Sequence, residues 1–168
     1  MIKYVSEINE IEFILSNLRR EDKEELENLF GNDWYQKTLS SLKDEKFLIL
    51  YGQGNATGRV PVAMGGFYKV EDKSADIACV WLLSSRFISQ NKTALMRVLK
   101  NQLYLNAHKY DILYNFIYKS NYGAKLWLKK LGFNFDNPNP KNIKLKKDFE
   151  FFYKTKERSN LCASSQQL

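Results

Sequence analysis

A short polar segment carries hydroxyl and cationic side chains directly before the longest predicted helix. This segment, residues 84–93, reads SSRFISQNKT. Amides at a helix N-terminus attract anions, hydroxyls add donors, and arginine or lysine adds charge-assisted hydrogen bonds. The side chains of this kind are Ser84, Ser85, Arg86, Ser89, Lys92 and Thr93. The segment is therefore suited to binding phosphate, although the same residues also fit an ordinary polar helix start with surface cations.

Residues suited to acid–base or metal chemistry are few and scattered along the sequence. Glu71, Asp72 and Asp76 fall in or near a predicted hairpin turn, whereas a general base would stand near the middle of a sheet. His108 is the only histidine and falls at the end of the longest predicted helix, where a cation complements the helix dipole. Since one histidine and two distant cysteines do not make a ligand set, we expect no metal site.

The composition is that of a single globular domain. The chain has 168 residues, of which 44% are hydrophobic and 27% charged, so it can bury one core. It has neither an apolar run near the roughly 20 residues that span a bilayer nor a signal-peptide pattern, so we expect no membrane contact. Cys79 and Cys162 are expected to stay reduced in a cytoplasmic setting. We predict one domain over residues 1–155 and a polar flexible tail over residues 156–168.

The charge pattern is uneven along the chain. The formal net charge of +7 favours an acidic partner or simply a soluble surface, and it does not distinguish nucleic acid from a phosphorylated cofactor. Lysines gather in the later part of the chain, whereas acids gather in the first predicted helix. Those acids are Glu21, Asp22, Glu24, Glu25 and Glu27. We interpret them as a solvated surface, and we keep DNA contact as a weaker alternative.

The first part of the chain is predicted to form a strand, two helices and a second strand. Residues 12–18 (EFILSNL) read as a short strand, and residues 20–30 as a helix with acids in its first turn. Asp33 is suited to capping a second helix. A compact buried strand follows at residues 47–51.

Two further strands, residues 60–70 and 75–83, are predicted to pair as an antiparallel hairpin. Gly65 and Gly66 in the first of them predict a bulge or bend. The longest helix then runs from residue 87 to about residue 109, because apolar residues recur there at every third or fourth position.

The strand at residues 112–118 is expected to run parallel to the second hairpin strand through a right-handed crossover. A helix follows within the segment NYGAKLWLKKLGF, capped by Asn121 and closed by a left-handed Gly132. A strand starting at Phe133 and a last strand over residues 143–153 complete the chain. The order predicts an α+β fold with one mixed, mostly antiparallel twisted sheet and helices on both faces.

With this element order and the residues Asn121, Ala124, Gly132 and Phe133, the chain resembles the GNAT superfamily of acyl-CoA N-acyltransferases over residues 12–153. These residues match the N-x-x-A…G-F segment of that superfamily. The resemblance implies a GNAT-like fold and a site for acetyl-CoA or CoA.

The resemblance also implies which residues would contact the cofactor. The backbone around Leu82 and Leu83 would bind the pantetheine amides, and Asn121 would touch the pantetheine arm. The pyrophosphate would meet the turn before the longest helix, through Ser85, Arg86, Gln90, Lys92 and Thr93. This turn lacks the glycines of the superfamily's Q/R-x-x-G-x-G/A phrase, and Leu128 stands where many members carry a tyrosine acid, so no catalytic residue is assigned.

A second resemblance, over residues 80–136, is to GNAT-like internal virion or assembly proteins of short-tailed phages. It rests on VWLLSSRF and on the W-L pair with its trailing F-x-F. This resemblance implies a virion-associated or morphogenesis protein with a degenerate CoA site, located in the host cytoplasm or packaged in the virion. Its partners would be other phage proteins. The alternative is an active N-acetyltransferase that moves an acetyl group from acetyl-CoA to an amine of a protein or small molecule.

Overall fold

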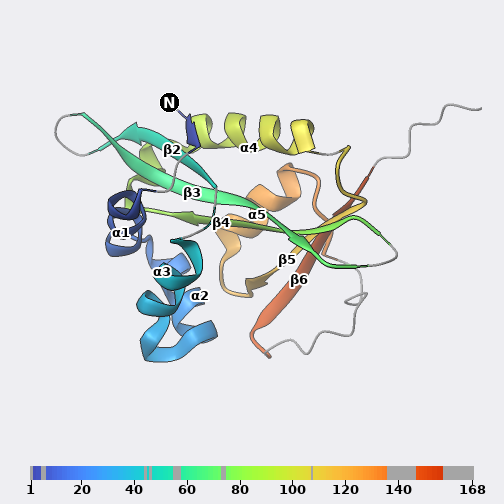
Figure 1. The fold of residues 1–168 in the computed structure, drawn as a ribbon, viewed down its shortest axis with the longest axis horizontal. Coiled ribbons are helices and arrows are strands. Elements are labelled where there is room, and N and C mark those ends of the chain that lie inside the picture. Colours follow the sequence, from blue (N-terminus) through green and yellow to red (C-terminus); the bar gives the residue numbers. More distant parts are fainter. Residues whose placement is uncertain are drawn as a thin grey trace, which may run out of the picture.

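The structure is a computed structural model, which describes residues 2–4, 7–43, 45, 47–54, 58–72, 75–106, 108–135 and 147–156. Six strands form one sheet in chain order (Figure 1). They are β1 (Ile2–Tyr4), β2 (Leu48–Gln53), β3 (Arg59–Val70), β4 (Ile77–Ser84), β5 (Ile112–Tyr118) and β6 (Phe149–Thr155). All neighbours pair antiparallel except β4 and β5, which are parallel. The predicted mixed, mostly antiparallel sheet is confirmed.

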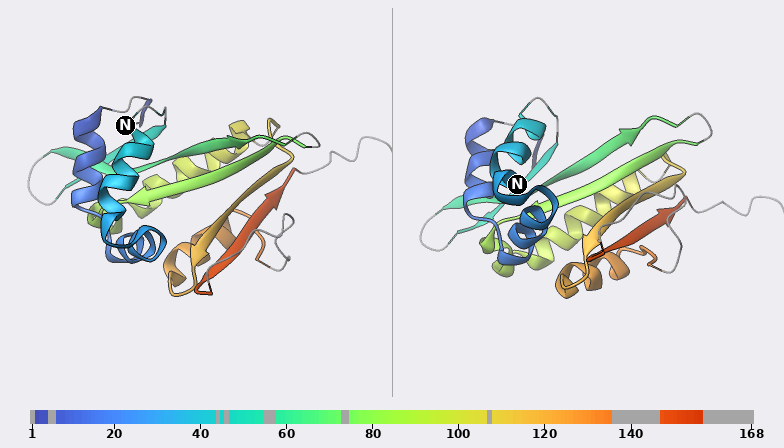
Figure 2. Two further views of the ribbon diagram at one scale, coloured as in Figure 1. Left: turned by 60° about the horizontal axis from the view of Figure 1, so that its bottom comes forward. Right: turned by 90° about the horizontal axis from the view of Figure 1, so that it is seen from below.

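Helices cover both faces of the sheet, as predicted (Figure 2). The helices are α1 (Ile8–Ser16), α2 (Arg20–Phe30), α3 (Trp34–Leu42), α4 (Lys92–Asn106) and α5 (Tyr122–Lys130), with two 3₁₀ turns, η1 (Gly31–Asp33) and η2 (Arg86–Gln90). On one face, Ile14 of α1 and Leu42 of α3 pack on Met64 of β3. On the other face, Leu95 of α4 packs on Leu50 of β2. α1, α3 and α4 each bury apolar side chains against strands that are apolar on that side.

The predicted strand at residues 12–18 is wrong, because residues 12–16 belong to α1 and only Leu18 makes a β-bridge, to Ser85. Ile11, Ile14 and Leu15 are three and four positions apart, and all three are buried on one side of the helix. That spacing is typical of a helix. It is better evidence for a helix than the short apolar run of residues 12–18 is for a strand. The first strand of the sheet is instead β1, which pairs antiparallel with β2.

The hairpin of β3 and β4 is confirmed, but the bulge predicted at Gly65 and Gly66 is wrong. The irregularity lies in the β2–β3 pairing, where Leu50 is opposite Ala63 and Tyr51 is opposite Pro61. Gly65 keeps the regular register, and a Cβ there would lie 2.6 Å from the carbonyl oxygen of Trp81. This glycine therefore allows a close approach between β3 and β4.

The longest predicted helix is divided into η2 and α4 at Asn91. The Asn91 side chain accepts a hydrogen bond from Gln53 N (3.0 Å) and donates to Gln53 O (3.1 Å) and Phe87 O (2.9 Å). A Cβ on Gly52 would lie 2.2 Å from Asn91 Oδ1, so glycine is needed for this contact. Asn91 thus fixes the turn after β4 to the end of β2, and α4 starts one residue later.

The end of the chain follows the prediction in part. Asn121 Oδ1 accepts from Ala124 N at 3.3 Å, and Gly132 has a φ of 82°, as expected for the cap and the closing residue of α5. Within the described residues, Asn134 forms a single antiparallel bridge to Tyr153 where a strand was predicted from Phe133. Residues 143–146 of the predicted last strand and residues 157–168 of the predicted tail lie outside the described residues.

No helix among the described residues is both long and apolar enough to cross a membrane.

The two glycines around α5 allow a matched test of this end of the fold. A Cβ at Gly132 would meet Lys154 Nζ at 2.7 Å and would sit on a left-handed backbone, whereas a Cβ at Gly123 would meet nothing within 4 Å. We expect Gly132→Ala to lower the free energy of unfolding by about 1–2 kcal/mol. Gly123→Ala should leave it unchanged or raise it by up to about 1 kcal/mol. Urea denaturation followed by circular dichroism measures both, and equal effects would contradict the assigned role of Gly132.

Candidate functional site

The parallel strands β4 and β5 pair over only three residues and then separate. Their partners are Ile77 with Ile112, Ala78 with Leu113 and Cys79 with Tyr114. At the next position the Asn115 side chain lies between the strands, donating to Val80 O (2.9 Å) and accepting from Phe116 N (2.7 Å). This amide takes the place of the next direct bond between the strands. Beyond it the sheet is open.

The opening exposes one edge of the β4 backbone. Val80 O and Ser84 N both face this edge, since they bond Asn115 and Asp22. Leu82 lies midway between them, so the alternation of a strand directs its N–H and C=O toward the opening, where no β5 residue pairs with it. Leu83, by the same alternation, directs its backbone toward Met64 of β3. Of the two predicted pantetheine contacts, only Leu82 offers its backbone to the opening.

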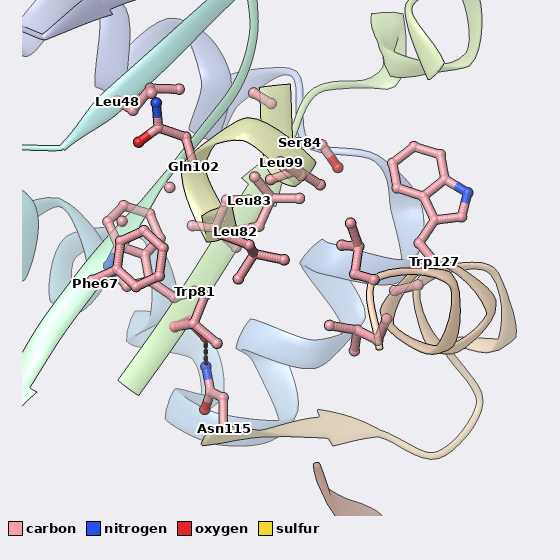
Figure 3. Close-up of a pocket in the computed structure, with 18 of the residues that line it drawn as sticks. Leu48, Phe67, Trp81, Leu82, Leu83, Ser84, Leu99, Gln102, Asn115 and Trp127 are labelled. Atoms are coloured by element: carbon pink, nitrogen blue, oxygen red, sulfur yellow. Dashed lines mark hydrogen bonds between the residues drawn. The ribbon is translucent and has the colours of Figure 1, made fainter. Parts of the chain in front are cut away.

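A cavity of about 530 Å³ passes through the opening and is lined from both faces of the sheet. Leu82, Leu99 of α4 and Trp127 of α5 line it on one face (Figure 3). Trp81 and Glu25 of α2 line it on the opposite face. Its size is within the range of small-molecule sites. The cavity therefore connects the two faces of the sheet at the opening.

A polar network closes the end of the opening. Asp22 accepts from Ser84 N (2.9 Å), from Ser84 Oγ (2.7 Å) and from the Arg19 guanidinium (2.6 Å). Arg19 also donates to Asn121 Oδ1 at 3.2 Å. Asp22 and Asn121 are both buried. These bonds hold the start of α2 against the end of β4 and the start of α5.

Glu25 is the titratable group that stands out in this cavity. Its carboxylate accepts from Tyr118 N and from the Asn121 side chain, each at 3.4 Å. Burial, with a further contribution from the negative charge of Asp22, raises the pKa of Glu25 to about 7, against the opposing effects of these two hydrogen bonds and of Arg19. A carboxyl group with this pKa in a cavity can accept a proton near neutral pH.

The sequence analysis treated Asp22 and Glu25 as surface acids, which is wrong for their positions. Both line the cavity, and Asp22 is 5% exposed. A usable signal was present, because Asp22 lies four positions before Leu26, the buried apolar residue of α2, and three positions before Glu25. Residues at this spacing share the inward face of a helix.

The predicted phosphate segment is only partly available to a ligand. Ser85 is fully buried and donates its hydroxyl to Val62 O (3.2 Å), and Ser84 is bound to Asp22, so these two hydroxyls serve the interior. Five side chains of the segment are exposed in η2 and in the first turn of α4: Arg86, Ser89, Gln90, Lys92 and Thr93. The predicted site is thereby reduced to the N-terminus of α4 and its flanking cations.

Two other sequence-based expectations can be placed on the structure. Leu128 of α5, noted in the sequence analysis as standing in place of a tyrosine, lines the cavity. Across the ranges that the structure describes, no three side chains of histidine, cysteine, aspartate or glutamate group as a metal site would require.

Comparison with known proteins identifies the fold. The sequence matches no protein-family model and no curated protein sequence. The structure is similar to an acetyltransferase from Streptococcus agalactiae, with a TM-score of 0.64 and 15% identity over 92% of this chain and 97% of that one. It is also similar to a GNAT-family acetyltransferase from Bacillus anthracis (TM-score 0.62, 14% identity, 94% and 95% covered). A third is the GNAT-family acetyltransferase from Streptococcus pneumoniae (TM-score 0.60, 13% identity, 92% and 98% covered). The chain has the fold of the GNAT acetyltransferases.

Proposed function

We propose that the protein is an acyl-CoA-dependent N-acyltransferase that acts on an amine of a protein or small molecule. The observation that carries this proposal is the opened sheet, in which the unpaired backbone of Leu82 faces a cavity lined from both faces. The shared fold of solved GNAT acetyltransferases supports it, although fold by itself does not determine function.

The residues of the opening fit a CoA thioester. The N–H and C=O of Leu82 are suited to the amides of an extended pantetheine arm, in the way that a strand edge binds a peptide. The first amides of α4, with Arg86, Lys92 and Thr93 exposed around them, are suited to the phosphates. Gln90 is exposed beside them. Asn121 is buried and already bonded to Arg19 and Ala124, so its role is to hold the start of α5 in place.

The acceptor amine would enter from the face covered by α2. A bound acyl-CoA would supply the acyl group: the amine nitrogen bonds to the thioester carbon, the C–S bond breaks, and CoA leaves as a thiolate. Glu25 would take the proton that the amine loses, because its pKa of about 7 keeps a large fraction ionised at neutral pH. Water would protonate the thiolate, since Leu128 has no hydroxyl. Holding the two reactants together supplies most of the rate enhancement in this scheme.

A second candidate is a virion-associated or morphogenesis protein that keeps the fold and has lost the chemistry. The observations that favour it are the glycine-free η2 turn and Leu128 at the cavity wall, together with the sequence resemblance to phage proteins. This role implies phage proteins as partners, a contact with packaged DNA through the lysine-rich surface, and a location in the host cytoplasm or virion. Detection of the protein in purified particles, with failed assembly after deletion of its gene, would favour this candidate over the enzyme.

CoA binding is the first expected outcome of the proposal. Titration calorimetry should detect binding of both CoA and acetyl-CoA. The double variant Arg86→Ala/Lys92→Ala should bind CoA about tenfold more weakly, because it loses charge-assisted bonds to phosphate. The variant Arg97→Ala/Lys100→Ala removes two exposed cations further along α4 and should bind within about threefold of the unmodified protein. Absence of heat and of a thermal shift at millimolar CoA would refute the proposal.

Proton transfer by Glu25 predicts a specific pH profile. kcat/KM of the unmodified protein should rise as pH increases through about 7, the pKa of Glu25. Glu25→Gln should lower kcat/KM at pH 8 by about 100-fold or more, while CoA affinity stays unchanged. The exposed Glu27→Gln on the same helix is the matched control. If Glu25→Gln kept the full rate and the same profile, Glu25 would not be the proton acceptor.

The same variants give a readout that does not require activity. Because the folded-state pKa of Glu25 is raised from 4.5 to about 7, its contribution to stability is fully present below pH 4.5 and is lost as pH rises through 7. Glu25→Gln cannot ionise, so its stability relative to the unmodified protein should increase between pH 5 and pH 8. Glu27→Gln should follow the unmodified protein. Denaturant unfolding at several pH values measures this difference.

A further inference from the structure

The cavity extends away from the opening, beneath α4. On that face of the sheet, Leu48 of β2, Gly65 of β3 and Leu82 of β4 lie directly opposite one another in one row. The middle member of this row has no side chain. All three line the cavity, together with Leu99 and Gln102 of α4 (Figure 3). We name the part bounded by Leu48, Gly65, Phe67, Leu99, Gln102 and Leu103 the β3 annex.

The β3 annex exists because β3 presents small residues to α4. Ala63 and Gly65 occupy successive positions on that face, and Phe67 follows them. A larger residue at Gly65 is excluded, because its Cβ would lie 2.6 Å from Trp81 O. The close approach of β3 and β4 thus requires a glycine at position 65, and the absence of a side chain there leaves the space beneath Leu99. Except for Gln102, the side chains that bound this annex are apolar.

Gln102, Asn106 and Lys109 line the cavity at the α4 end near the annex, whereas its acidic residues and Arg19 lie elsewhere. Arg19, Asp22, Glu25 and Asn121 stand at the end of the opening, near Ser84. The pantetheine of the proposed donor would follow the backbone edge of Leu82, and the annex lies on the other side of the Leu82 side chain, over β3. An acetyl group adds a single methyl beyond the thioester carbonyl, so it would leave the annex empty. An apolar space of this kind is filled most favourably by hydrocarbon.

We propose that the donor substrate is a CoA thioester with an unbranched acyl chain longer than acetyl, whose methylenes occupy the β3 annex. This inference rests on the proposed acyltransferase function and specifies its acyl group. The annex extends from β4 across β3 to β2, about 10 Å at the usual strand spacing, which suits a chain of roughly six to eight carbons.

Binding of a chain-length series tests the inference without any need for turnover. Calorimetry with CoA, acetyl-CoA and hexanoyl-CoA would be performed on the unmodified protein. Each methylene that is fully buried strengthens binding by about fourfold, so hexanoyl-CoA should bind at least about tenfold more tightly than acetyl-CoA. Its binding should also show a more negative heat-capacity change. CoA and acetyl-CoA should bind within about threefold of each other.

A variant that fills the annex provides the matched control. Leu99→Trp should remove the advantage of hexanoyl-CoA while keeping the affinity for acetyl-CoA within about threefold. Tyr104→Trp adds the same indole at a position on α4 that is 79% exposed, and it should keep the full advantage. The chain-length series on the unmodified protein decides the matter even if Leu99→Trp fails to fold.

The outcomes separate the two proposals. If CoA and acetyl-CoA bind but hexanoyl-CoA binds no more tightly, the acyl-chain inference is overturned and the acyltransferase proposal stands. If none of the three binds, both are overturned. If hexanoyl-CoA binds more tightly but Leu99→Trp keeps that advantage, the chain lies elsewhere and the assignment to the annex is overturned.

Discussion

The limited pairing of β4 with β5 is the constraint on which the other features depend. Two parallel strands that stayed paired along their full length would form a closed sheet, and α4 and α5 would pack on it as on any other. Here pairing stops after Cys79 and Tyr114. The backbone edge of Leu82, the cavity between the two helices and the contact of α2 with the far side of that cavity all follow from this separation. The separation of the two strands thus determines where the cavity lies, and the side chains determine only its lining.

An open sheet must be stabilised at its free end, and this chain does so with buried polar groups. Asp22 satisfies the amide and hydroxyl of Ser84, and Arg19 joins Asp22 to Asn121. Removing one member of such a network leaves others buried without partners, which is more costly than the net gain from any single bond. The network also places a negative charge beside Glu25, so the bonds that hold the sheet open also help to raise the pKa of Glu25. Stability and proton affinity are coupled at this end of the molecule.

Much of the fold could be read from the sequence, and the errors have physical reasons. The helix at Arg20–Phe30 and the strand at Ile112–Tyr118 match their predicted residues, because apolar spacing and turn signals agree there. The strand prediction for residues 12–18 was wrong because a short apolar run fits both the helix and the strand periodicity. In the cavity, the resemblance named Leu82, whose backbone edge faces the opening. Glu25 was not named, because a helix rich in acids was interpreted as a solvated surface. The Asn115 contact depends on where two strands separate, which local sequence does not specify.

The Asn115 side chain makes the length of the opening depend on one amino acid. In most sheets the extent of pairing is distributed over many backbone groups, so no single substitution alters it. Here one amide satisfies a carbonyl on β4 and an N–H on β5, and it marks the last connected position. A residue without that amide would leave the two backbones to bond directly or remain unsatisfied. Among the described residues, Asn115 is thus a position at which one substitution would change how far β4 and β5 stay connected.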